Sequence, residues 1–138
     1  MSRSGRWLTL FQGAAGLSDT STGLLLIFAP AWTLRLMGVR WLPQPIEFAG
    51  FIGVFVLSVG LTYLLVAVRW PIARQNTVVW EVQWWITALV RTLVAVFLLV
   101  EIVSGRMEFA WISVALSDGM LAVIQWIGLA RGWLKNVG

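Results

Sequence analysis

The sequence predicts an all-α fold, an integral membrane four-helix bundle with both termini on the same side of the bilayer. The first observation is composition: 59% of the residues are hydrophobic, only 12% are charged, and the mean hydropathy is +0.86. A soluble domain carries about 25% charged residues, so most of this surface is expected to face the lipid bilayer. The second observation is a set of four apolar stretches. Each is long enough to cross the roughly 30 Å hydrocarbon core at about 1.5 Å per residue.

The four stretches cover roughly residues 7–29, 46–68, 80–103 and 109–130. They leave no room for a soluble domain, so residues 1–138 are expected to form a single transmembrane domain. The first stretch is not interpreted as a signal peptide, because its apolar run resumes at residues 23–28, beyond the hydrophobic region of such a peptide. Residues 30–45 mix apolar and basic side chains, which predicts a segment lying in the membrane interface. The other connections are short and predict antiparallel packing of sequential helices.

Arginine and lysine are distributed unevenly between the two predicted sides. The side with both termini and the second loop holds six of them: Arg3, Arg6, Arg69, Arg74, Arg131 and Lys135. The first and third loops hold three: Arg35, Arg40 and Arg106. Cytoplasmic loops carry the excess of positive residues. The sequence therefore predicts a multi-pass protein of the inner (plasma) membrane with both termini in the cytoplasm.

The chain lacks cysteine and histidine. Disulfides, thiol chemistry and zinc sites of the usual kind are excluded, and the common axial ligand of haem is missing. We therefore expect no metal and no cofactor. The net charge of +4 is too small for a nucleic-acid surface, so no nucleic-acid partner is expected. No motif identifies a catalytic residue, and an enzyme is the less favoured interpretation.

Three ionisable residues fall near the middle of predicted spans: Asp19 in the first, Arg91 in the third and Asp118 in the fourth. An unpaired charge at the centre of a span costs roughly 2.5–3.5 kcal/mol on insertion scales. Because pairing reduces that cost, the three are predicted to form one buried intramembrane cluster. A functional site, such as a proton-linked carboxylate, and a structural clasp that holds helix register are about equally supported.

Polar residues beside these charges indicate which helix faces point inward. Supporting positions are Gln12 in the first stretch, Gln83 and Thr87 in the third, and Ser117 and Gln125 in the fourth. The second stretch has no central charge. It carries Gly50, Gly53 and Gly60 instead, small residues that allow helix backbones to approach closely.

The first stretch also contains five consecutive polar residues, 18–22. A continuous helix is favoured there over a break, because a single polar run without proline rarely interrupts a span.

Most of the ten tryptophans lie near the ends of the stretches, as in an aromatic belt at the membrane interface. Examples are Trp7, Trp70, Trp80, Trp111 and Trp133. Trp84 and Trp85 lie one turn deeper, where they could line a pocket or face lipid headgroups. The lipid or interface position is favoured for both.

The run Gly23-Leu24-Leu25-Leu26-Ile27-Phe28-Ala29-Pro30 and the glycine-rich segment from Ala49-Gly50-Phe51-Ile52-Gly53 to Gly60-Leu61 resemble the DoxX-like group of small bacterial membrane proteins. The resemblance implies a four-helix protein of a bacterial inner membrane. Some members of that group are similar to membrane subunits of quinone-linked oxidoreductases. No active-site motif of the group can be carried over to residues of this chain.

Three functions remain open. The favoured one is a non-catalytic membrane subunit or scaffold, with a larger membrane complex as partner. The second is a homo-oligomeric small transporter or channel that uses a mid-membrane carboxylate. The third is a membrane enzyme or binding protein that acts on a lipid-soluble molecule, with Asp19 and Asp118 as acid and base in the enzyme case.

Overall fold

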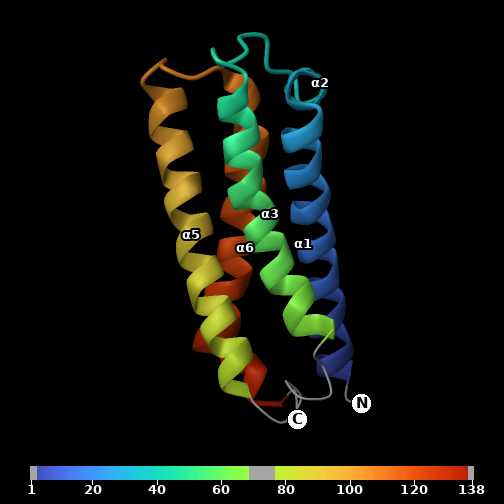
Figure 1. The fold of residues 1–138 in the computed structure, drawn as a ribbon. Coiled ribbons are helices and arrows are strands. Elements are labelled where there is room, and N and C mark those ends of the chain that lie inside the picture. Colours follow the sequence, from blue (N-terminus) through green and yellow to red (C-terminus); the bar gives the residue numbers. More distant parts are fainter. Residues whose placement is uncertain (1–2, 69–76, 137–138) are drawn as a thin grey trace.

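Four long helices dominate the computed structural model, which describes residues 3–68 and 77–136 (Figure 1). They are α1 (Arg3–Phe28), α3 (Glu47–Val68), α5 (Thr77–Val103) and α6 (Ile112–Ala130). A short helix, α2 (Pro30–Leu36), and two 3-10 helices, η1 (Phe109–Trp111) and η2 (Trp133–Asn136), complete the described elements. The prediction of an all-α fold is confirmed for this part of the chain. Arg69, Trp70 and Arg74 lie outside the described residues.

Three helical segments are long and apolar enough to cross a membrane: Glu47–Val68, Thr77–Val103 and Phe109–Ala130, with mean hydropathies of 2.5, 2.3 and 1.6. They correspond to the predicted second, third and fourth spans. α1 has 26 residues and is also long enough, but the polar run at residues 18–22 lowers its hydropathy. The polar run does not break α1, so the prediction of a continuous helix there is confirmed.

The long helices alternate in direction along the chain and form two hairpins (Figure 1). α1 packs closely against α3, and α5 packs closely against α6. Within the described residues, no Cα atom of α1 lies within 8 Å of a Cα atom of α5 or α6. The start of α1 and the end of α6 lie at the same end of the bundle, which we call the terminal end. The opposite end, which carries α2, is the α2 end.

Glycine brings the backbones of α1 and α3 into contact. A Cβ atom on Gly23 would lie 2.5 Å from the backbone nitrogen of Leu57, and one on Gly60 would lie 2.5 Å from the backbone nitrogen of Thr20. A Cβ atom on Gly53 would lie 2.8 Å from the carbonyl oxygen of Gly23, whereas one on Gly50 would meet α1 only at 3.7 Å, an ordinary contact. The first hairpin is therefore a close glycine-mediated pair over several turns, an arrangement typical of membrane helices.

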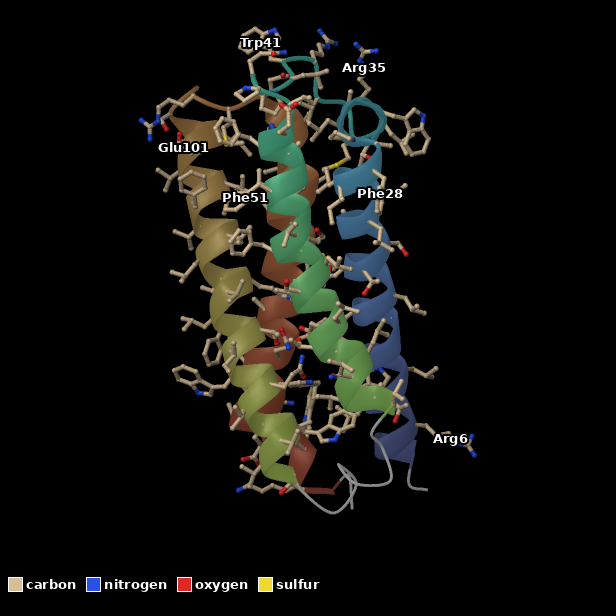
Figure 2. All side chains as sticks on the ribbon, viewed as in Figure 1. Arg6, Phe28, Arg35, Trp41, Phe51 and Glu101 are labelled. Atoms are coloured by element: carbon tan, nitrogen blue, oxygen red, sulfur yellow. The ribbon has the colours of Figure 1, made fainter. Side chains whose placement is uncertain are left out.

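Residues 37–46 and α2 cover the α2 end. Pro30 begins α2 directly after α1, and the hydroxyl of Thr33 donates to the carbonyl oxygens of Ala29 (2.8 Å) and Leu25 (3.0 Å). Leu34 and Val39 turn inward and pack with Leu26 and Ala49. Arg35 and Trp41 lie at the outer edge of this end (Figure 2), and Trp41 is 82% exposed. The segment thus has one buried apolar side and one exposed side, as an interfacial segment requires.

The outer surface of the long helices is largely apolar. Exposed large hydrophobic residues occur on all four: Leu17, Phe28, Phe51, Phe55, Leu65, Leu93, Phe97, Leu116 and Met120 are examples. The interior, in contrast, has apolar clusters toward its two ends and polar residues between them. A surface this apolar around a polar centre suits hydrocarbon rather than water as solvent.

Candidate functional site

Arg91 is the centre of the polar interior. It lies on α5, is 4% exposed, and directs its guanidinium group between the two hairpins. Its Nη2 donates to Oδ2 of Asp19 on α1, and its Nη1 donates to Oδ1 of Asp118 on α6. Arg91 therefore bridges three helices through two ion pairs.

The remaining guanidinium nitrogen of Arg91, Nε, contacts α3, so that Arg91 binds side chains on all three of the other long helices. Its Nε donates to the phenol oxygen of Tyr63 on α3 at 3.3 Å, and its guanidinium carbon lies 5.4 Å from the centre of the Tyr63 ring. Tyr63 is completely buried and is the only tyrosine of the sequence. Tyr63 is not among the residues predicted from the sequence. Its position as a lone phenol in the middle of an apolar stretch was the signal that could have identified it.

The two carboxylates are less buried than the arginine. The side chains of Asp19 and Asp118 are 16% and 19% exposed, against 4% for Arg91. Two carboxylates share one guanidinium, so the triad of Asp19, Arg91 and Asp118 carries one excess negative charge when both acids are ionised. The structure brings together the three charges that the sequence places at one depth.

A second polar group lies between the triad and the terminal end. The amide of Gln12 on α1 donates to Oε1 of Gln83 on α5 at 2.9 Å, and its oxygen accepts the indole N–H of Trp84, also at 2.9 Å. Gln12 is fully buried and Gln83 nearly so. Since these bonds join α1 to α5, they are a second bridge between the hairpins.

Thr87 and Gln125 link α5 to α6 within the second hairpin. Nε2 of Gln125 donates to the hydroxyl oxygen of Thr87 at 2.8 Å, and that hydroxyl donates to the carbonyl of Gln83 at the same distance. Both side chains are buried. Four of the five predicted supporting residues therefore belong to the polar interior: Gln12, Gln83, Thr87 and Gln125.

The prediction for Ser117 is wrong. Its side chain is exposed, and its hydroxyl donates to the carbonyl of Val114 on its own helix at 3.1 Å. Adjacent helical positions are separated by about a quarter turn. With Asp118 directed toward Arg91, Ser117 faces outward.

The prediction for Trp84 is also wrong, as is the placement of Trp80 in the interfacial belt. Both side chains are completely buried, in a cluster with Leu8 and Leu134. Gly128 on α6 makes room for Trp84, because a Cβ atom there would lie 2.6 Å from the indole ring. The prediction for Trp85 agrees with the structure, since this side chain is 55% exposed and stacks edge-on against Trp126.

Glu108 makes a further structural contact that the sequence pattern did not indicate. Its carboxylate accepts the backbone N–H of Arg40 at 3.0 Å and that of Trp41. It therefore ties the connection between α2 and α3 to the start of η1.

In the described part of the chain, no group of three or more histidine, cysteine, aspartate or glutamate side chains could hold a metal ion. Comparisons with protein-family models, curated proteins and solved structures found no match for this chain. The class that fold and site define is a multi-span membrane protein, with a buried arginine bridged to two aspartates.

Proposed function

We propose that this chain is a non-catalytic membrane subunit or scaffold in which the triad is a structural clasp between two helical hairpins. The observation that carries the proposal is that every guanidinium nitrogen of Arg91 has a partner within the chain: Asp19, Asp118 and Tyr63. Each nitrogen of the guanidinium therefore donates to a side chain of its own bundle, as a structural clasp requires.

The arrangement of the helices supports the same role. α1 keeps its Cα atoms more than 8 Å from those of α5 and α6, so only long side chains join the first hairpin to the second there. Arg91 and Gln12 provide the polar joining contacts, and Leu8 and Phe11 of α1 add apolar packing against Trp84 of α5. Buried polar contacts of this kind favour one register of the two hairpins over others, because a shifted register leaves a charge unpaired in hydrocarbon.

We further propose that α1 is the fourth span and that both termini lie in the cytoplasm, in an inner membrane. α1 runs beside α3 with backbone contact at Gly23 and Gly60, so a membrane that contains α3 also surrounds α1. Its central charge, Asp19, is paired. The orientation is supported by the six-to-three distribution of arginine and lysine. The resemblance to DoxX-like proteins is retained as a proposal about fold only.

The experiment is purification of a tagged chain from its native membrane in a mild detergent, followed by mass determination of the complex. A scaffold is expected to co-purify with a second protein in fixed stoichiometry. The variant Leu116→Glu places a charge on the exposed apolar surface of α6. Loss of the co-purifying protein from this variant would show that this surface contacts the partner. Recovery of the chain alone, as a monomer or homo-oligomer, contradicts the scaffold role.

Transport is the second candidate, and one observation favours it. The triad holds two carboxylates for one guanidinium, and both carboxylates are more exposed than Arg91. An excess mid-membrane carboxylate is what proton- or cation-coupled transport requires. Purified chain in liposomes should then show proton or cation flux that Asp19→Asn or Asp118→Asn abolishes while the melting temperature is retained. Absence of flux from a folded, reconstituted chain leaves the scaffold role.

A further inference from the structure

The triad leaves one negative charge without a positive partner. Arg91 supplies a single positive charge to the two carboxylates of Asp19 and Asp118. Other charged residues of α5 are far away: Glu81 and Glu101 stand ten positions before and after Arg91, about 15 Å at 1.5 Å per residue. The other charges on the remaining long helices lie at the helix starts: Arg3, Arg6 and Glu47. No neighbouring residue of these helices therefore balances the second carboxylate.

Each carboxylate gives one oxygen to Arg91 and keeps the other. Oδ2 of Asp19 and Oδ1 of Asp118 accept from the guanidinium. Oδ1 of Asp19 and Oδ2 of Asp118 form no hydrogen bond with any residue that the structure describes. A carboxylate oxygen away from bulk water is costly unless it bonds to a donor or takes up a proton.

Tyr63 adds a third group at the same place. Its phenol oxygen is completely buried and accepts from Nε of Arg91 at 3.3 Å, whereas its own hydrogen donates to no residue of the described chain. Because Tyr63 and both aspartates bond to one guanidinium, the two free oxygens and the phenol hydrogen lie around it. A buried water needs about two to four polar partners. These groups therefore suit a water molecule, from which an acid takes up a proton.

The accessible part of the triad is its carboxylate side. Asp19 and Asp118 are 16% and 19% exposed, against 4% for Arg91. They stand on α1 and α6, whose described Cα atoms stay more than 8 Å apart. The other seam between the hairpins holds an apolar groove of ≈ 530 Å³ between α3 and α5, and no residue of the triad lines that groove. Exchange with the surroundings therefore takes place at the carboxylates and not at Arg91.

A proton fits these atoms better than a metal ion does. Ca²⁺ takes about six to eight oxygen ligands and Mg²⁺ a near-ideal octahedron, whereas the triad offers two free carboxylate oxygens. The guanidinium that holds both acids also repels any metal cation placed between them. A proton needs only one oxygen.

From these observations we infer that the triad binds one exchangeable proton, shared between Asp19 and Asp118. The proton comes from water and adds to one of the two free oxygens, forming an O–H bond. The net charge of the triad then changes from −1 to zero, which suits a site in the middle of the hydrocarbon core. The inference depends on the proposal that α1 is a span, and it is compatible with a clasp and with a transporter.

The test is infrared difference spectroscopy of the full chain in lipid nanodiscs at neutral pH, in H₂O and in D₂O. A protonated carboxyl group gives a C=O stretching band that shifts in D₂O, and an ionised carboxylate lacks this band. Wild type is expected to show the band of one carboxylic acid. Asp19→Asn and Asp118→Asn are each expected to abolish it, because the remaining acid is then balanced by Arg91 and stays ionised.

Glu47→Gln is the matched control, since Glu47 is exposed at the start of α3, and it should leave the band unchanged. Melting temperatures identify variants that do not fold, and the wild-type spectrum decides the matter if neither Asn variant folds. A wild type without the band overturns the inference. A folded Asn variant that keeps the band also overturns it, because the proton would then belong to one acid alone.

These outcomes are separate from those of the functional proposals. The band without flux in liposomes supports the proton site and contradicts transport. Co-purification with a partner depends on neither spectrum nor flux, so failure of the scaffold role leaves the proton site standing.

Discussion

Gly23 of α1 and Gly53 of α3 lie in direct backbone contact: a Cβ atom on Gly53 would stand 2.8 Å from the carbonyl oxygen of Gly23. This contact sets the distance between the two helices of the first hairpin. It also leaves no space for any side chain at either position.

The first prediction follows from that contact. Gly53→Leu should destabilise the protein by more than Leu65→Ala, because the new side chain forces two backbones apart, whereas Leu65 is exposed on the outer face of α3. Overpacking of this kind typically costs about 1–3 kcal/mol or more. Thermal unfolding in detergent compares the two variants. Equal melting temperatures would show that α1 and α3 are not in contact at Gly53.

The second prediction concerns Arg91. Arg91→Leu removes the partner of both Asp19 and Asp118 and should destabilise the bundle by about 3–5 kcal/mol, the usual effect of breaking a buried ion pair. The control is the triple variant Asp19→Leu, Arg91→Met, Asp118→Leu, which removes every charge of the triad. A structural clasp predicts that the triple variant is more stable than Arg91→Leu, because it leaves no unpaired charge. A triple variant that is no more stable would contradict the pairing.

The third prediction concerns the second bridge between the hairpins. Gln12→Leu leaves the indole N–H of Trp84 and the amide oxygen of Gln83 without their partner, at a typical cost of about 1–3 kcal/mol for an unsatisfied buried group. Ser117→Ala is the matched control, since that hydroxyl is exposed and bonds only to its own helix. Its melting temperature should equal that of wild type. A larger loss from Ser117→Ala than from Gln12→Leu would contradict the assignment of the inward faces.

The fourth prediction tests the proposed topology. Reporter fusions after Gly138 and within residues 35–40 should report opposite sides of the membrane, with the C-terminal reporter in the cytoplasm. The expectation rests on the six arginine and lysine residues of one side against three on the other. A C-terminal reporter on the outer side would reverse the orientation. Reporters on the same side would show that the segment from α3 to α6 does not cross the membrane three times.

Much of the fold follows from local chemistry. Runs of apolar residues predict the long helices to within a few residues, because burial in hydrocarbon leaves an uninterrupted helix as the stable backbone conformation. α3, for example, is predicted at 46–68 and observed as Glu47–Val68. The depth of Asp19, Arg91 and Asp118 follows from the same counting, since rise per residue is constant along a helix.

Sequence alone could not tell which side of each helix faces inward. Trp84 and Trp85 are neighbours of identical chemistry, yet one is fully buried and the other is 55% exposed. Ser117 and Asp118 differ in the same way. In a membrane, the lipid-facing side of a helix and the side that faces the other helices are both apolar. The usual contrast between a polar outer side and an apolar inner side is therefore weak. Neighbouring helices decide the direction: Gly128 makes room for the ring of Trp84.

The sequence by itself determined the helical class of this protein, the extent of its long helices and the common depth of its three central charges, because each depends only on hydropathy and helical rise. The tertiary structure decided that Arg91 contacts both aspartates and Tyr63. It also decided that the four long helices pair as two hairpins, and that a groove opens between α3 and α5. Those features depend on the rotation of each helix and the distance to its neighbour. Both are set by packing between residues far apart in the chain, such as Gly23 with Gly53 and Gln12 with Gln83.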